Sequence, residues 1–127
     1  MSKVERLGYV GVGAGDLDAW EDYATNVLGV SVQEREEDGT MLLRHDKHHY
    51  RLAVHPDPCD DLLYIGWQVA DDIALADFRA HLDNLGIEFV EGTAEEVEAR
   101  RVGELIKLAD PNGVKLEIFH SPLIDYL

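Results

Sequence analysis

The chain is poor in cysteine, in basic residues and in long apolar runs. Only one of its 127 residues, Cys59, is a cysteine, which excludes an internal disulfide and a zinc site made of several cysteines. No apolar run approaches the roughly 20 residues that a membrane-spanning helix needs. Residues 1–6 lack the apolar stretch that follows the charged end of a signal peptide. We therefore expect a cytoplasmic protein.

Basic residues are scarce beside acidic ones. Eleven Lys and Arg stand against 26 Asp and Glu, so the formal net charge is -15. A nucleic-acid-binding protein needs a basic face to displace counterions from phosphates, and an anionic membrane repels such a chain. We expect neither partner. The remaining composition, 46% hydrophobic and 29% charged, is typical of a single globular domain.

Two segments of the chain repeat one pattern. Residues 9–11 (Tyr-Val-Gly) match residues 64–66 (Tyr-Ile-Gly), and the Leu-Gly pair at 28–29 matches the pair at 85–86. Each copy reads as a strand, an amphipathic helix, a glycine that ends the helix, and further strands. We therefore expect two duplicated modules within one domain, at about residues 4–58 and 62–122.

Helix boundaries are predicted by local capping signals. Asp16 and either Asp71 or Asp72 are good N-caps, and Thr93 with Glu96 has the spacing of a capping box. A short helix is therefore expected after Thr93. In the first helix the apolar residues recur at helical spacing: Leu17, Trp20, Ala24, Val27 and Leu28.

Alternating apolar residues predict the strands that follow each helix. Residues 41–45 and 48–54 predict a hairpin that turns at residues 46–47 and pairs Leu43 with Tyr50. Residues 110–113, Asp-Pro-Asn-Gly, fit a type I turn with a following bulge. Each module is then βαβββ. The expected fold is α+β, with one cupped mixed sheet and helices on its outer face.

A family resemblance runs from about residue 4 to residue 122. The segments that carry it are Glu5-Arg6-Leu7-Gly8-Tyr9, Leu28-Gly29, Leu43-Arg44 with Asp46, Arg51-Leu52-Ala53-Val54, Asp61-Leu62 with Tyr64, and Asp110-Pro111-Asn112-Gly113 with Leu116-Glu117-Ile118. The chain resembles the vicinal oxygen chelate superfamily, which includes glyoxalase I, bleomycin-resistance proteins and extradiol dioxygenases. More narrowly, it resembles the N-terminal domain of the two-domain extradiol dioxygenases that act on 2,3-dihydroxybiphenyl-like catechols.

The resemblance also implies where a metal would be held. The superfamily places its ligands on the first strand of each module and on the last strand, which correspond here to Tyr9, Tyr64 and Glu117. Extradiol enzymes use two histidines and a glutamate on Fe(II). A neutral phenol, which ionises near pH 10, is a poor ligand. We therefore expect no metal, cofactor-binding or catalytic residue in this chain, and Fe(II) only in the family's second domain, which is absent here.

Strand alternation places these same three residues on one face of the sheet, opposite the helices. Three interpretations stay open. The hydroxyl groups of Tyr9 and Tyr64 satisfy a partly buried Glu117 carboxylate, or the three side chains line a small polar binding pocket, or Glu117 is exposed.

The histidines and the cysteine offer only weak alternatives. His45 and His48 share a face at the hairpin tip and form a weak candidate metal pair, whereas His49 and His55 fall on the other face. We expect all four to be solvated turn histidines. His120 is expected on the helix side of the sheet. Cys59 lies in a loop without an evident partner base and is interpreted as incidental.

The resemblance implies a non-catalytic N-terminal half of an extradiol ring-cleaving dioxygenase. That activity, an oxidoreductase step of aromatic catabolism, cleaves a catechol beside its two hydroxyls with insertion of both atoms of O2. This chain would contribute packing and assembly surface, with the second domain or another copy as partner. Residues 121–127 would start a linker that docks onto the second domain. The alternative is a stand-alone, metal-free dimeric binding protein of the glyoxalase/bleomycin-resistance type that holds a small aromatic ligand. A stand-alone enzyme with unusual ligands is a third option.

Overall fold

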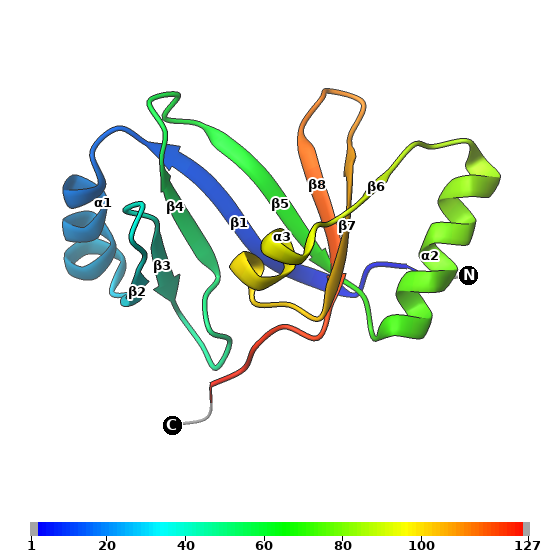
Figure 1. The fold of residues 1–127 in the computed structure, drawn as a ribbon. Helices are drawn as coiled ribbons and strands as arrows, with labels where there is room; N and C mark the ends of the chain where they lie inside the picture. The colour runs from blue at the N-terminus through cyan, green and yellow to red at the C-terminus, as the bar shows by residue number, and fades with distance from the viewer. Residues whose placement is uncertain (1–2, 126–127) are drawn as a thin grey trace. The chain divides into compact units, whose positions relative to one another are not determined.

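The computed structural model describes residues 3–125, which contain two copies of one βαβββ arrangement (Figure 1). By their contacts the residues fall into two units. The first unit comprises residues 9–64 and the segment from residue 124 onward, and the second comprises residues 65–123 and the segment up to residue 8. Within the described residues, no helix is long and apolar enough to cross a membrane.

The first copy contains four strands and one helical segment. Its elements are β1 (Arg6–Ala14), α1 (Leu17–Tyr23), the π-helical turn η1 (Ala24–Leu28), β2 (Ser31–Arg35), β3 (Met41–Arg44) and β4 (Leu52–Pro56). Its strand order is β2-β3-β4-β1. Strands β1 and β4 are parallel, and the other neighbours are antiparallel.

The second copy repeats this order with an additional helix, α3, between its second and third strands. Its elements are β5 (Leu62–Gln68), α2 (Asp72–Leu85), β6 (Val90–Glu91), α3 (Ala94–Arg100), β7 (Glu104–Ala109) and β8 (Lys115–His120). Its strand order is β6-β7-β8-β5, with β5 and β8 parallel. The predicted α+β class, mixed pairing and twofold βαβββ pattern are therefore confirmed. Strands β1 and β5 each give residues to both units, and the predicted module boundaries stay a prediction.

The capping signals act as predicted. The Asp16 carboxylate accepts a hydrogen bond from the backbone N–H of Ala19 at 3.0 Å, and Asp71 accepts one from Ala74 at 2.8 Å. Thr93 forms the full capping box that starts α3. These bonds satisfy N–H groups that a helix leaves without an internal partner.

The end of the first helix differs from the prediction. After Tyr23 the backbone widens into the π-helical turn η1, in which the N–H of Gly29 bonds to the carbonyl of Ala24. A π-turn spaces its hydrogen bonds five residues apart, so it rotates the following side chains away from the apolar stripe. Val27 and Leu28 are consequently exposed.

The first hairpin has another register than predicted. Leu43 lies opposite Leu52, not opposite Tyr50. The reason is a longer loop, in which the Asp46 carboxylate accepts hydrogen bonds from the backbone N–H of His48 and from the Arg51 guanidinium. The shift is two residues, so the apolar face is kept.

The second predicted turn, at residues 110–113, is confirmed. The N–H of Gly113 donates to the carbonyl of Asp110 at 2.9 Å, and Gly113 has a left-handed φ of +85°. Such a residue after a type I turn forms the expected bulge because glycine adopts positive φ without steric cost.

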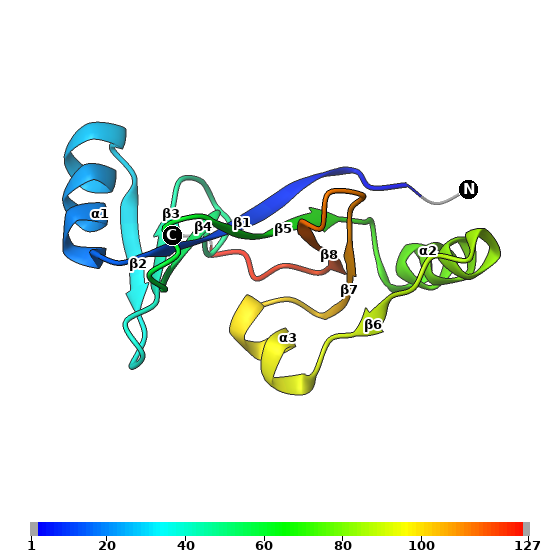
Figure 2. The ribbon, with the colours of Figure 1, turned by 90° about the horizontal axis from the view of Figure 1, so that it is seen from above.

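Each unit has its own apolar core, which lies between its strands and α1 in the first unit and between its strands and α2 in the second. The core of the first unit is Ala14, Ala24, Met41, Leu43 and Val54, with Leu17 and Trp20 packed against it. The core of the second is Val69, Leu75, Leu82, Ile106 and Ile118, with Trp67, Phe78 and Leu108 packed against it. Within the second unit, α2 and α3 lie on opposite faces of β7 and β8 (Figure 2).

Two glycines in strands allow an aromatic ring to pack directly against the backbone. A Cβ atom at Gly11 would lie 2.1 Å from Cζ of Tyr64, and one at Gly8 would lie 2.2 Å from Cζ of Phe119. A side chain at either position would therefore collide with a buried ring, and glycine is what allows the ring to lie there.

Candidate functional site

Three tyrosines, Tyr9, Tyr50 and Tyr64, lie together in the first unit and are called here the tyrosine cluster. All three are buried, at 3%, 6% and 6% exposure. The ring centroids of Tyr9 and Tyr64 are 5.8 Å apart in an edge-to-face arrangement, and those of Tyr9 and Tyr50 are 5.6 Å apart. Val12 on β1 packs against the core of the first unit, so strand alternation turns Tyr9 to the opposite face, as predicted.

His55 connects this cluster with the surface. Its Nε2 lies 2.7 Å from the hydroxyl oxygen of Tyr64, and its Nδ1 lies 3.2 Å from Oγ1 of Thr40. The backbone N–H of Thr40 donates to the exposed Asp38 carboxylate at 2.8 Å. Hydrogen bonds from Thr40 hold the pKa of Asp38 below its usual value. We call Asp38, Thr40, His55 and Tyr64 the relay.

Glu117 is held by a residue that the sequence analysis did not find. Nε of Arg100 donates to Oε1 of Glu117 at 2.9 Å, and Nη2 donates to Oε2 at 2.9 Å. The two side chains are 16% and 5% exposed. The interpretation of Glu117 as exposed is therefore wrong, and a guanidinium from α3 is a partner of its carboxylate. This bidentate geometry is a strong form of charged hydrogen bond.

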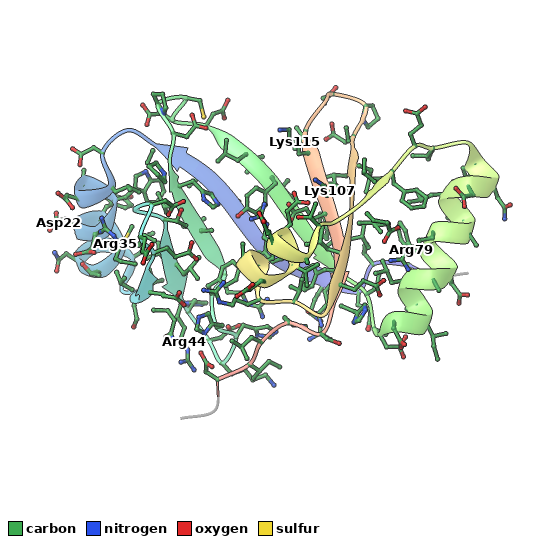
Figure 3. The ribbon with its side chains drawn as sticks, in the orientation of Figure 1. Asp22, Arg35, Arg44, Arg79, Lys107 and Lys115 are labelled. Carbon is green, nitrogen blue, oxygen red and sulfur yellow. The ribbon has the colours of Figure 1, made fainter. Side chains whose placement is uncertain are left out.

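The position of Arg100 depends on how α3 packs on β7 and β8. Nζ of Lys107 on β7 donates to Oε2 of Glu96 at 2.7 Å, which joins the start of α3 to the sheet (Figure 3). Glu96 also closes the capping box with Thr93, so its pKa is lowered by hydrogen bonds from Lys107 and Thr93. The start of this helix is thereby fixed on the face from which Glu117 projects.

The residues at the superfamily's ligand positions do not fit Fe(II). Both oxygens of the Glu117 carboxylate accept from a guanidinium, which already balances its charge. The Tyr64 hydroxyl is hydrogen-bonded to His55, and a neutral phenol is a poor ligand. Among residues 3–125, no three His, Cys, Asp or Glu side chains are grouped so that they could hold a metal ion.

The histidines of the first hairpin differ from the prediction. His45 is exposed, but His48 is buried, and its Nδ1 lies 2.9 Å from Nη2 of Arg51. The positive charge of the Arg51 guanidinium disfavours binding of a metal cation at Nδ1 of His48. The geometry therefore does not support His45 and His48 as a metal-binding pair. His49 and His55 are also partly buried rather than solvated. The hairpin loop packs against other segments, which the local sequence pattern does not reveal.

The last described residues pack against this hairpin. Nδ1 of His49 lies 2.6 Å from Oδ2 of Asp125, and its Nε2 lies 2.9 Å from Oε1 of Glu34. Nη2 of Arg44 donates to the backbone carbonyl of Asp125 at 2.7 Å (Figure 3). Asp125 is thus held by side chains of the first unit. Residues 126–127, which belong to the predicted linker, lie outside the described residues.

His120 lies on the helix side of its strand, as predicted. Its Nε2 is 3.0 Å from Oε1 of Glu104, and Nη2 of Arg79 on α2 donates to Oε2 of the same carboxylate at 2.6 Å (Figure 3). Hydrogen bonds from His120 and Arg79 lower the pKa of Glu104. This charged group joins α2 to β7 and β8.

Cys59 is exposed, and the Asp57 carboxylate beside it raises the pKa of the thiol. A raised pKa disfavours the thiolate, which is the reactive form. The geometry therefore supports the interpretation of Cys59 as incidental.

Comparison with known proteins identifies relatives of one kind. Residues 7–56 match the family described as dihydroxybiphenyl dioxygenase BphC D1. A biphenyl-2,3-diol 1,2-dioxygenase of Sphingomonas paucimobilis is 40% identical over 125 residues, which are 98% of this chain and 42% of that protein. An iron-dependent extradiol dioxygenase of Rhodococcus jostii (strain RHA1) is 36% identical over 97% of this chain and 41% of its own length.

Solved structures agree with the sequence relatives. A crystal structure of a catechol 2,3-dioxygenase has 43% sequence identity and a TM-score of 0.95, over 98% of this chain and 42% of that one. A halotolerant catechol dioxygenase, BphC, has 25% identity and a TM-score of 0.89. The predicted resemblance to extradiol dioxygenases is confirmed. The chain spans about two fifths of the length of the relatives that it matches.

Proposed function

We propose that this chain, which is related in sequence and fold to the first domain of the extradiol dioxygenases, is the non-catalytic half of such an enzyme. The observation that carries the proposal is the unequal coverage: nearly all of this chain aligns with less than half of each relative. The enzyme as a whole would cleave a catechol-type aromatic ring, with 2,3-dihydroxybiphenyl-like compounds as the substrate class. A cytoplasmic location is part of the same proposal.

Iron binding would belong to the portion of the relatives that this chain does not match. One relative is named as iron-dependent. In this chain the ligand positions hold tyrosines in a cluster and a glutamate bound to Arg100. The residues that hold Fe(II) and act on the substrate would therefore lie in the second domain. The role of this chain would be to pack against that domain and to support assembly.

The proposed partner is the second domain or another copy of the chain. Exposed apolar side chains on the second unit, including Ile73, Leu85 and Val90, support a role in packing. Each is more than half exposed, and apolar surface of this kind is characteristic of interaction sites when it is contiguous.

The proposal is tested by activity and iron content together. The isolated chain, incubated anaerobically with Fe(II) and then given O2 and 2,3-dihydroxybiphenyl or catechol, should yield no yellow ring-cleavage product above an iron-only control. Elemental analysis should find no stoichiometric iron. Turnover well above the control would contradict the proposal and support a stand-alone enzyme.

The coding sequence provides a second test. The proposal expects it to continue past Leu127 into another βαβββ pair, with histidines where this chain has Tyr9 and Tyr64 and a glutamate that matches Glu117. A stop codon directly after Leu127, together with a stable dimer that binds an aromatic ligand, would favour the metal-free binding protein instead.

A further inference from the structure

The serine that follows β8 contacts a histidine, which in turn contacts a carboxylate. Oγ of Ser121 lies 2.8 Å from Nδ1 of His120, and Nε2 of the same imidazole lies 3.0 Å from Oε1 of Glu104. We call these three residues the serine triad. A hydroxyl, an imidazole and a carboxylate joined in this order activate a serine as a nucleophile, and such a group is recognised by its geometry rather than by sequence position.

The direction of both hydrogen bonds follows from the state of the Glu104 carboxylate. Its Oε2 accepts from Nη2 of Arg79 at 2.6 Å, and this charged partner keeps the carboxylate ionised, so that it is an acceptor only. Nε2 of His120 therefore donates to it. In a neutral imidazole the other nitrogen, Nδ1, is then an acceptor, and the Ser121 hydroxyl donates to it. A general base needs this tautomer in order to take the serine proton.

The backbone at Ser121 has a conformation that is uncommon for serine. Its φ is +57°, in the left-handed region, and it comes directly after the last residue of β8. Strained positions of this kind cluster at functional sites, and the serine of a nucleophile elbow also follows a strand in a sharp turn. Gly103 packs against the pair: a Cβ atom there would lie 3.0 Å from Cβ of Ser121 and 3.1 Å from Cε1 of His120. The fold thus restricts both side chains.

Exposure changes along the serine triad in the direction that nucleophilic chemistry requires. Ser121 is exposed, so a small substrate can reach its oxygen. His120 is 8% exposed and Glu104 is partly buried, so the bond between imidazole and carboxylate is sheltered from water. The electrostatic interaction between the two groups is strengthened in such a setting.

We propose that Ser121 is an acyl-accepting nucleophile with His120 as its general base, and that its substrates are small, activated carboxylic esters. In the first step, Oγ of Ser121 bonds to the carbonyl carbon and the bond from that carbon to the alcohol oxygen breaks. The serine proton moves to Nδ1 of His120 and then to the leaving alcohol. Water next attacks the acyl carbon, its proton returns through Nδ1 to Oγ, and the carboxylic acid leaves. Ester and water are the only reactants, and no electron is transferred.

Glu104 and Arg79 are positioning residues for this reaction. Glu104 accepts the Nε2–H of His120, which fixes the tautomer, and its negative charge stabilises the imidazolium that forms when His120 holds the serine proton. Arg79 fixes the carboxylate from α2. All four residues belong to the second unit. The proposal involves neither iron nor ring cleavage, so it does not depend on the proposed function.

Site-resolved labelling tests whether Ser121 is activated. The chain, in buffer with EDTA, is treated with a fluorophosphonate, which bonds to an activated serine as fluoride leaves, and peptide mass spectrometry locates the adduct. The chain has three serines, and Ser31, exposed at the start of β2, is the internal reference. Because a general base contributes about 10²–10⁴-fold, Ser121 should react at least about 100-fold faster than Ser31. The rate should fall in acid, where a protonated imidazole no longer accepts the serine proton.

Two variants separate this chemistry from a purely structural role. Ser121→Gly removes the nucleophile, and because glycine adopts positive φ without steric cost, the near-UV circular dichroism should be unchanged. Glu104→Gln places an amide beside His120 that can donate to Nε2, so that the imidazole proton moves to Nδ1. Nδ1 then no longer accepts from Ser121, and labelling should slow by about 100-fold in a chain that remains folded.

Hydrolysis of 4-nitrophenyl acetate tests the complete reaction. The chain should release 4-nitrophenolate in excess over protein, and faster than Ser121→Gly, which measures the background from other side chains. Three results would overturn the proposal: a rate of hydrolysis equal to that of Ser121→Gly, labelling of Ser121 no faster than that of Ser31, or a labelling rate unaffected by Glu104→Gln.

Discussion

Replacing Arg100 with methionine should strongly destabilise the chain. The Glu117 side chain is 5% exposed and accepts two hydrogen bonds of 2.9 Å from Arg100. Methionine keeps the apolar stem of the arginine but leaves a buried carboxylate without this counter-charge. Breaking a buried ion pair in this way costs about 3–5 kcal/mol. Since a domain has a total stability of about 5–15 kcal/mol, the loss is a large fraction of it.

Equilibrium unfolding in urea measures this loss directly. With a slope of about 2 kcal/mol per molar urea, the midpoint should fall by about 2 M in Arg100→Met. The double variant Arg100→Met/Glu117→Leu should recover most of the stability, because it removes both charges. Lys107→Met, which breaks the half-exposed pair with Glu96, is the matched control and should cost at most about 1 kcal/mol. If Arg100→Met costs no more than Lys107→Met, the argument from burial is wrong.

Three further predictions concern packing, pH and metal. Gly11→Ala would place a Cβ atom 2.1 Å from Cζ of Tyr64 and should cost about 1–3 kcal/mol in thermal unfolding, whereas Gly15→Ala, with no contact closer than 3.6 Å, should be nearly neutral. The pKa of Glu104 is lower in the folded chain than the usual 4.5, so its contribution to stability is present above that value and is lost as pH falls through the folded pKa. Glu104→Gln should therefore lower the urea midpoint at neutral pH and leave it nearly unchanged in acid; equal losses at both would contradict the assignment. Elemental analysis should find no stoichiometric iron, zinc or manganese, and one metal per chain that disappears in Glu117→Ala would contradict the assignment of Arg100 as its counter-charge.

The features that the sequence predicts correctly are those that depend on neighbouring residues. Asp16, Asp71 and Thr93 cap their helices through hydrogen bonds that span three residues, so their spacing alone is informative. The turn at residues 110–113 also depends on its own proline and glycine. The twofold βαβββ pattern follows because each copy repeats these local signals.

The features that were missed depend on packing between distant segments. Arg100 and Glu117 meet only because α3 lies over β8, and nothing near either residue indicates the other. His55 was expected in solvent together with the other histidines of the hairpin, yet Thr40 and Tyr64 come from two other strand regions to contact it. In these cases the tertiary arrangement determines which residues are in contact, and no local sequence pattern indicates it.

The two glycines that lie under aromatic rings have a consequence for evolution. Gly11 and Tyr64 occupy adjoining volume in the first unit, and Gly8 and Phe119 do so in the second. Neither member of a pair can enlarge unless the other shrinks. An alignment of relatives should therefore show each pair of positions covarying, with a smaller residue in place of the ring wherever the glycine is replaced. An evolutionary change from a glycine with a ring to a larger residue with a smaller partner would pass through an intermediate sequence. That intermediate would be either overpacked or left with a cavity.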